Sequence, residues 1–131
     1  MQTQIGALWR GLPYTDLTAS ERLFLYLLRS HVKARTGTAC GPAQIPPALC
    51  AFVDSFWACL SDGLLIAPIH CRCPLQLYEQ NLINLLRAHL KGDFEAFTME
   101  VQDLLPAEVI ERLWRLAPTV EDEVTAELNM L

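Results

Sequence analysis

The segment Ala19–Arg35, ASERLFLYLLRSHVKAR, decides the expected fold because it holds six consecutive large apolar residues, Leu23 to Leu28. Periodicity cannot separate a buried strand from a buried helix in so short a run. The flanking residues favour a helix. Thr18 is a suitable N-cap with Glu21 three residues later, as in a capping box, and Gly37 follows where a left-handed C-cap is expected.

Apolar side chains surround this helix on nearly all sides, and a helix of that kind is normally buried against several neighbours. Its basic residues Arg22, Arg29 and Lys33 share one narrow sector of the helical wheel. We therefore expect residues 19–35 to form the central helix of a bundle, with this basic stripe at the surface.

Proline, glycine and capping residues divide the rest of the chain into four more expected helices. Residues 64–69 are expected to be a buried, extended connector, and no stretch alternates as an amphipathic strand would. The acidic segment 119–131 is either a solvated tail or a weak helix. The four expected helices are Pro47–Ser61, Leu75–Lys91, Phe94–Leu105 and Ala107–Leu116, the last ended by Pro118.

These patterns predict one all-α domain over residues 1–131, with an N-terminal arm at residues 1–14. The composition is 52% hydrophobic and 19% charged, against roughly 25% charged residues in an average domain. This apolar surplus suggests burial against a second subunit, and two-fold dimers are the commonest closed assemblies. The net charge of −5 argues against nucleic acid as a partner.

No charge-free apolar stretch is long enough to span a bilayer, and the N-terminus has no signal-peptide pattern. We expect a cytoplasmic protein without membrane partners. An odd number of cysteines fits reduced thiols in that compartment. The five are Cys40, Cys50, Cys59, Cys71 and Cys73.

The string His70-Cys71-Arg72-Cys73-Pro74 offers an imidazole and two thiols, which are ligands suited to zinc. Its Cys-x-Cys spacing departs from the usual separation of two to four residues, and a fourth ligand would have to come from Cys40, His31 or His89. We predict a structural role without metal. A reactive thiol is the alternative, since Cys73 lies where a helix is expected to begin.

The chain contains no dinucleotide fingerprint, phosphate-binding loop, nucleophile elbow or His-Glu-x-x-His motif. His31 and His89 fall on inward-leaning helix faces, where hydrogen-bonded core histidines are expected. No catalytic residue, metal ligand or cofactor is predicted. A helix-turn-helix joined at Pro106 is conceivable, but the second helix mixes Glu and Arg and suits a major groove poorly.

Several apolar residues are candidates for a dimer or partner contact, because large apolar and aromatic side chains are typical of interface cores. Ile83 falls beside the polar stripe of its helix and is expected to be exposed. The candidates are Leu8, Trp9, Leu12, Ile83 and Trp114.

The chain also resembles a group of small, largely uncharacterised proteobacterial helical proteins over residues 17 to 116. The likeness rests on Glu21-Arg22-Leu23-Phe24-Leu25, His70 to Leu75, Glu79, Leu85-Leu86 and Gly92-Asp93. More faintly, the chain is similar to small helical anti-activators that bind quorum-sensing transcription factors and block their dimerisation. The resemblance implies a homodimeric, all-α, non-catalytic regulator, and it assigns no binding residue.

The expected function is therefore that of a non-enzymatic regulator that occupies an apolar surface of a protein partner, such as a transcription factor. The first alternative is a zinc- or thiol-based sensor that uses His70, Cys71 and Cys73. The second is a small helical DNA-binding regulator.

Overall fold

The computed structural model describes residues 12–37, 45–60 and 66–130. These residues form a short 3-10 helix, η1 (Tyr14–Asp16), and five α-helices, with no strand among them. The all-α fold class is thereby confirmed. The α-helices are α2 (Ala19–Arg35), α3 (Pro47–Trp57), α4 (Leu77–Leu90), α5 (Phe94–Val101) and α6 (Ala107–Asn129).

The predicted caps of α2 are present. The Thr18 hydroxyl accepts a hydrogen bond from the Glu21 amide (3.1 Å), and Glu21 Oε1 accepts one from the Thr18 amide (2.9 Å). Gly37 has a φ of +76°, which a residue with a Cβ rarely adopts. Helix α2 begins and ends at the predicted residues because both ends are determined by local hydrogen bonds and backbone freedom.

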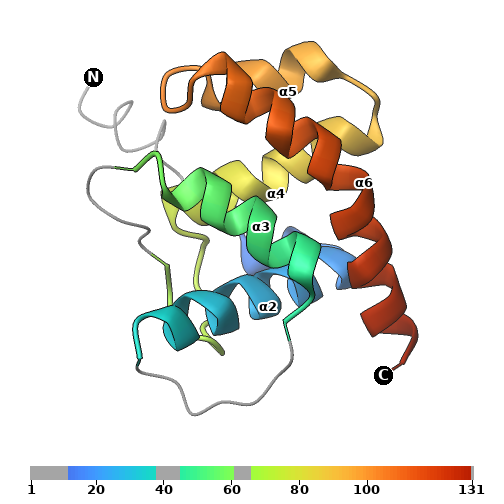
Figure 1. The fold of residues 1–131 in the computed structure, drawn as a ribbon. Helices are drawn as coiled ribbons and strands as arrows, with labels where there is room; N and C mark the ends of the chain where they lie inside the picture. Colours follow the sequence, from blue (N-terminus) through green and yellow to red (C-terminus); the bar gives the residue numbers. More distant parts are fainter. Residues whose placement is uncertain (1–11, 38–44, 61–65, 131) are drawn as a thin grey trace, which may run out of the picture.

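Helix α6 packs against all four other α-helices, most extensively against α3. In Figure 1 it runs from α5 at one end of the molecule to α2 at the other and crosses α3 on the way. Helix α2 packs against α3, α4 and α6. The residues at the centre are fully buried and come from every α-helix, among them Leu28, Phe52, Phe56, Leu82, Phe97, Leu113 and Val120.

The predicted end of the last helix is wrong, because α6 continues through Pro118 to Asn129. Proline inside a helix costs about 3 kcal/mol in lost hydrogen bonding and steric conflict. Here Pro118 faces solvent, and the buried stripe continues on both sides of it with Leu113, Ala117 and Val120. Burial of this stripe offsets the cost, so most of residues 119–131 are a packed helix.

Glu123 gives the C-terminal half of α6 a second role. Its carboxylate accepts hydrogen bonds from the amides of Ala48 (3.0 Å) and Leu49 (2.9 Å) in the first turn of α3. Amides at a helix start lack partners within the helix, and the helix dipole favours negative charge there. Two helices far apart in the sequence are therefore joined by a cap.

Two predictions about exposure are also wrong. Arg29, assigned to a surface stripe, is 1% exposed, and Ile83, assigned to the edge of a polar stripe, is 0% exposed. Helix α5 packs against α4, and Asn84 beside Ile83 donates to Glu100 of α5 (3.3 Å). The helical wheel of α4 alone does not show that α5 covers the side of α4 that carries Ile83 and Asn84.

Within the described ranges, no helix combines the length and apolar character needed to cross a bilayer.

Candidate functional site

A buried ion pair between α2 and α4 organises the loop that holds the predicted cysteine cluster. Arg29 Nε and Nη2 donate to the two carboxylate oxygens of Glu79 at 2.7 and 3.0 Å. Arg29 Nη1 donates to the Cys71 carbonyl (2.8 Å), while Glu79 accepts from the amides of Ala67 (3.0 Å) and Gln76 (2.9 Å). The pair therefore ties both ends and the middle of the loop 66–76 to the core.

In this loop the structure does not bring a metal site together. His70 and Cys73 are exposed, and the His70 ring lies 6.1 Å from the ring of Tyr26. No group of three His, Cys, Asp or Glu side chains suited to a metal ion occurs in the part of the chain that the structure describes. Cys40, one of the three residues from which a fourth ligand would have to come, lies outside those residues.

The two thiols of the loop differ in acidity. The Cys73 amide donates to Cys71 Sγ (3.4 Å), and this bond lowers the pKa of the Cys71 thiol. The side-chain hydrogen bond with Cys71 raises the pKa of the Cys73 thiol. Cys71 is therefore the thiol whose thiolate is stabilised by a backbone donor, and the thiolate is the reactive form.

A second cluster, absent from the sequence predictions, joins α2 to α3. His31 Nε2 lies 2.8 Å from Asp54 Oδ1, and His31 Nδ1 lies 3.5 Å from Cys50 Sγ. Arg35 also donates to Asp54 (2.6 Å). The expected role of His31 as a hydrogen-bonded core residue is thus confirmed, and α2 and α3 are held together by it.

In this cluster His31 lies between a cysteine and an aspartate, as in a Cys–His–Asp catalytic triad, but its surroundings do not favour the thiolate that such a site needs. Burial raises the pKa of the Cys50 thiol, and the negative charges of Asp54 and Glu123 raise it further. An acyl-transfer site also needs free donors for an oxyanion. The nearby first-turn amides of α3, at Ala48 and Leu49, already donate to Glu123.

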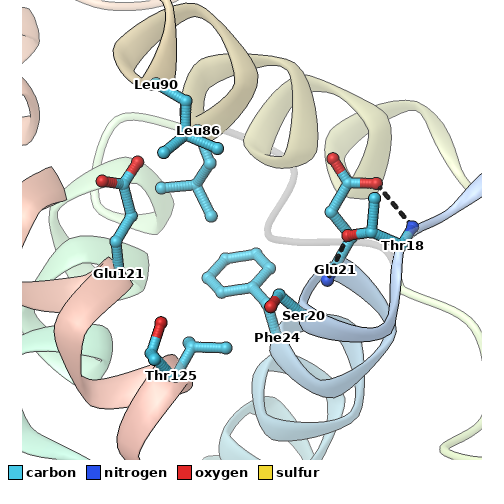
Figure 2. A pocket seen from close by; sticks show the side chains of 9 residues that line it. Thr18, Ser20, Glu21, Phe24, Leu86, Leu90, Glu121 and Thr125 are labelled. Carbon is cyan, nitrogen blue, oxygen red and sulfur yellow. Dashed lines mark hydrogen bonds between the residues drawn. The ribbon is translucent and has the colours of Figure 1, made fainter. Parts of the chain in front are cut away.

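An apolar pocket of about 180 Å³ lies where α2, α4 and α6 meet. Figure 2 shows Phe24 of α2 at its centre, with Leu86 of α4 pointing toward the ring and Leu90 farther along the same helix. Val124 of α6 adds a further apolar wall. Polar side chains surround this apolar interior: Thr18, Ser20, Glu21, Glu121 and Thr125.

An ion pair and a histidine–carboxylate contact hold the border of the pocket in place. Arg87 donates to Glu21 through Nε (2.6 Å) and Nη2 (2.9 Å), and these bonds hold the pKa of Glu21 below its usual range. His89 Nδ1 lies 3.1 Å from Glu121 Oε2. The two carboxylates are thus fixed on opposite sides of the pocket, one on α2 and one on α6.

A second, more open hollow of about 300 Å³ lies on the other side of His89. It is lined by Phe94, Glu111, Trp114 and Arg115. The Trp114 ring packs edge-on against the rings of His89 (4.8 Å), Phe94 and Phe97 (both 5.0 Å). Because His89 contacts both Trp114 and Glu121, the pocket and the hollow adjoin one another.

We call the combined region the Leu90–Trp114 surface; it comprises the residues that line the pocket and the hollow, with His89 between them. Leu90 is 70% exposed and Phe94 is 42% exposed, whereas Phe24 at the floor is buried. The region therefore offers protruding apolar side chains beside a concave apolar floor. Exposed apolar patches bordered by polar residues are typical of protein-interaction surfaces in general.

The predicted contact residues do not form one patch. Trp114 belongs to the Leu90–Trp114 surface, whereas Ile83 is inside the core. Leu12 is held against the protein's own chain, because its amide donates to Gln80 of α4 (2.8 Å) and its carbonyl accepts from Leu75 in the loop before α4 (3.0 Å). Leu8 and Trp9 lie outside the described residues.

Leu90 and Phe94 were missed as surface residues. Both flank the turn around Gly92, which has a φ of +68° and reverses the chain between α4 and α5. An apolar residue next to a helix-ending glycine is a weak signal by itself, because it also suits contacts within the C-cap. Their exposure depends on how α6 lies against them.

Comparison with family models, with curated proteins and with solved structures finds no match for this chain.

Proposed function

We propose that this chain is a non-enzymatic, cytoplasmic regulatory protein that binds an amphipathic helix of another protein on the Leu90–Trp114 surface. The observation that carries the proposal is the exposed Leu90 beside an apolar pocket whose floor is Phe24. A partner helix could place apolar side chains into such a groove at helical spacing.

Charge around the surface indicates the chemistry of the partner. Glu111 lines the hollow, Glu121 lines the pocket, and Asp122 is exposed next to Glu121. With the chain's net charge of −5, these carboxylates favour a helix whose apolar residues are flanked by Lys or Arg. Arg115 is the single basic residue among those lining the hollow.

The resemblance to quorum-sensing anti-activators suggests the class of partner. A transcription factor that dimerises through an amphipathic helix would lose its dimer contact when that helix lies in the groove. The proposed mechanism is therefore competition for a dimerisation helix, with the protein itself acting as a homodimer.

The test combines affinity capture with three single substitutions. Leu90→Ala and Trp114→Ala should each weaken capture of the partner from a bacterial lysate. Truncation of an interface anchor costs on the order of 2 kcal/mol or more. Met99→Ala is the matched control, because Met99 is 63% exposed on α5 and does not line the pocket or the hollow.

Support requires that the captured protein be a transcription factor and that its dimer fraction fall when the purified chain is added. Equal capture by all three variants, or a partner whose dimer is unaffected, would refute the proposal. Circular dichroism of each variant verifies that the helices are intact.

A second candidate function is thiol-based sensing, which the lowered pKa of the Cys71 thiol favours. The Cys71 thiolate would attack one oxygen of hydrogen peroxide and break its O–O bond, which gives a sulfenic acid and releases the other oxygen as hydroxide, protonated to water. The Cys73 thiol would then displace a second water molecule and form a disulfide. Mass spectrometry after peroxide treatment should show loss of the two thiol hydrogens, and Cys71→Ser should abolish it.

A further inference from the structure

A second pocket, here called the basic pocket, lies on the other side of α2 from the apolar pocket. It holds about 110 Å³ and is formed by η1, α2 and the loop 66–76. At about 100° per residue, Arg22 and Tyr26 point away from Phe24 on the α2 wheel, so the two pockets use opposite helix faces. The residues that line it and carry polar groups are Tyr14, Arg22, Tyr26, Arg29, His70 and Arg72.

The charge of the basic pocket is unusual for an acidic chain, because three arginines and a histidine line it and no carboxylate does. The charge of Arg29 is compensated by its buried ion pair with Glu79. Arg22 and Arg72 form no ion pair with any carboxylate in residues 12–37, 45–60 and 66–130. The pocket therefore keeps two uncompensated guanidinium groups.

These two guanidinium groups are held in position. The Arg22 guanidinium lies 5.0 Å and that of Arg72 lies 6.0 Å from the centroid of the Tyr14 ring. Arg22 Nη2 also donates to the Thr15 carbonyl (3.3 Å). A cation over an aromatic face is oriented by the ring quadrupole but keeps its charge.

The loop side of the basic pocket is fixed by the buried ion pair. Arg29 donates to the Cys71 carbonyl (2.8 Å), and Cys71 stands between His70 and Arg72 in the sequence. The backbone that carries the imidazole and the second guanidinium is thus tied to α2. A site whose donors are placed in advance loses less entropy when a ligand binds.

We propose that the basic pocket binds the phosphate group of a small phosphorylated molecule. Guanidinium groups donate pairs of parallel hydrogen bonds to phosphate oxygens. Tyr26 and His70 also line the pocket, with their ring centroids 6.1 Å apart, and each carries a group that can donate a hydrogen bond. Two fixed positive charges match a phosphate dianion better than a monocarboxylate. The volume far exceeds the roughly 10–15 Å³ that one water molecule requires, so a phosphate group fits while the rest of the ligand extends into solvent.

The test is a titration of the full chain with inorganic phosphate, followed by calorimetry and by NMR of the side chains. Wild-type protein should bind phosphate, with shifts concentrated at His70 and Tyr26. Arg22→Gln and Arg72→Gln should each raise the Kd at least tenfold. Arg112→Gln, which alters an exposed arginine of α6, should leave the Kd unchanged.

Acetate at equal ionic strength separates phosphate recognition from general anion binding. Binding of acetate as tight as that of phosphate, or phosphate binding that survives in both pocket variants, overturns the proposal. Both variants replace exposed side chains, so their melting temperatures in phosphate-free buffer should match that of the wild type. Shifts in the wild type that avoid His70 and Tyr26 would also overturn it, and this result does not depend on any variant.

Discussion

Replacement of Glu79 by Gln should destabilise the protein severely, although the two side chains have nearly the same shape. Glu79 is 0% exposed and its carboxylate accepts four hydrogen bonds, two from Arg29 and one each from Ala67 and Gln76. Gln offers one oxygen in place of two and brings an amide NH₂ close to groups that donate. The Arg29 charge, which is 1% exposed, loses its counter-ion.

Breaking a buried ion pair by removing one partner costs about 3–5 kcal/mol, because the remaining charge is left uncompensated. For a chain of this size each kcal/mol lowers the melting temperature by roughly 3–5 °C, so a fall on the order of 10 °C or more is expected. Urea denaturation followed by circular dichroism gives the change in unfolding free energy. Glu95→Gln, at an exposed position of α5, is the control and should lie within about 0.5 kcal/mol of the wild type.

Hydrogen exchange locates the effect. Amide exchange at Ala67 and Gln76 should accelerate in Glu79→Gln, because both amides lose a carboxylate acceptor. A Glu79→Gln protein whose unfolding free energy stays within about 0.5 kcal/mol of the wild type would refute the reasoning, since an uncompensated buried charge should destabilise the fold by several kcal/mol.

Further predictions concern titration, thiols, metal and assembly. Burial raises the pKa of Glu100, so the folded state holds this proton more tightly and stability falls as pH rises from the ordinary glutamate range through the raised value. Glu100→Gln should therefore melt at a higher temperature than the wild type at pH 7, and the two should converge near pH 4, as calorimetry can show. Iodoacetamide at neutral pH should label Cys71 before Cys73, and peptide mass spectrometry that finds the reverse order contradicts the assigned acidities. Elemental analysis of purified protein should find no stoichiometric zinc, and one equivalent would contradict the structural role given to the His70–Cys73 string. Light scattering should give the mass of a homodimer; a monomer mass at micromolar concentrations would contradict it.

The sequence by itself determined the features that depend on neighbouring residues. The capping box of Thr18 and Glu21 and the left-handed Gly37 set both ends of α2, Gly92 sets the end of α4, and a proline begins α3 as predicted. The predicted ends of two other helices are wrong, because α3 stops at Trp57 rather than Ser61 and α5 at Val101 rather than Leu105. These signals are local, because a cap or a left-handed residue acts within one turn of the chain. The all-α class follows from them, together with helical spacing of the apolar residues.

Tertiary structure alone decided which charged and apolar side chains are buried. Arg29 resembles a surface residue on the wheel of α2, and only the approach of Glu79, 50 positions later, makes its burial possible. Pro118 ends a helix by local rules, yet the buried stripe of α6 carries the helix past it. The Leu90–Trp114 surface and the basic pocket arise in the same way. Each joins α2 to residues more than 30 positions later in the sequence, and their distances depend on packing rather than on spacing along the chain.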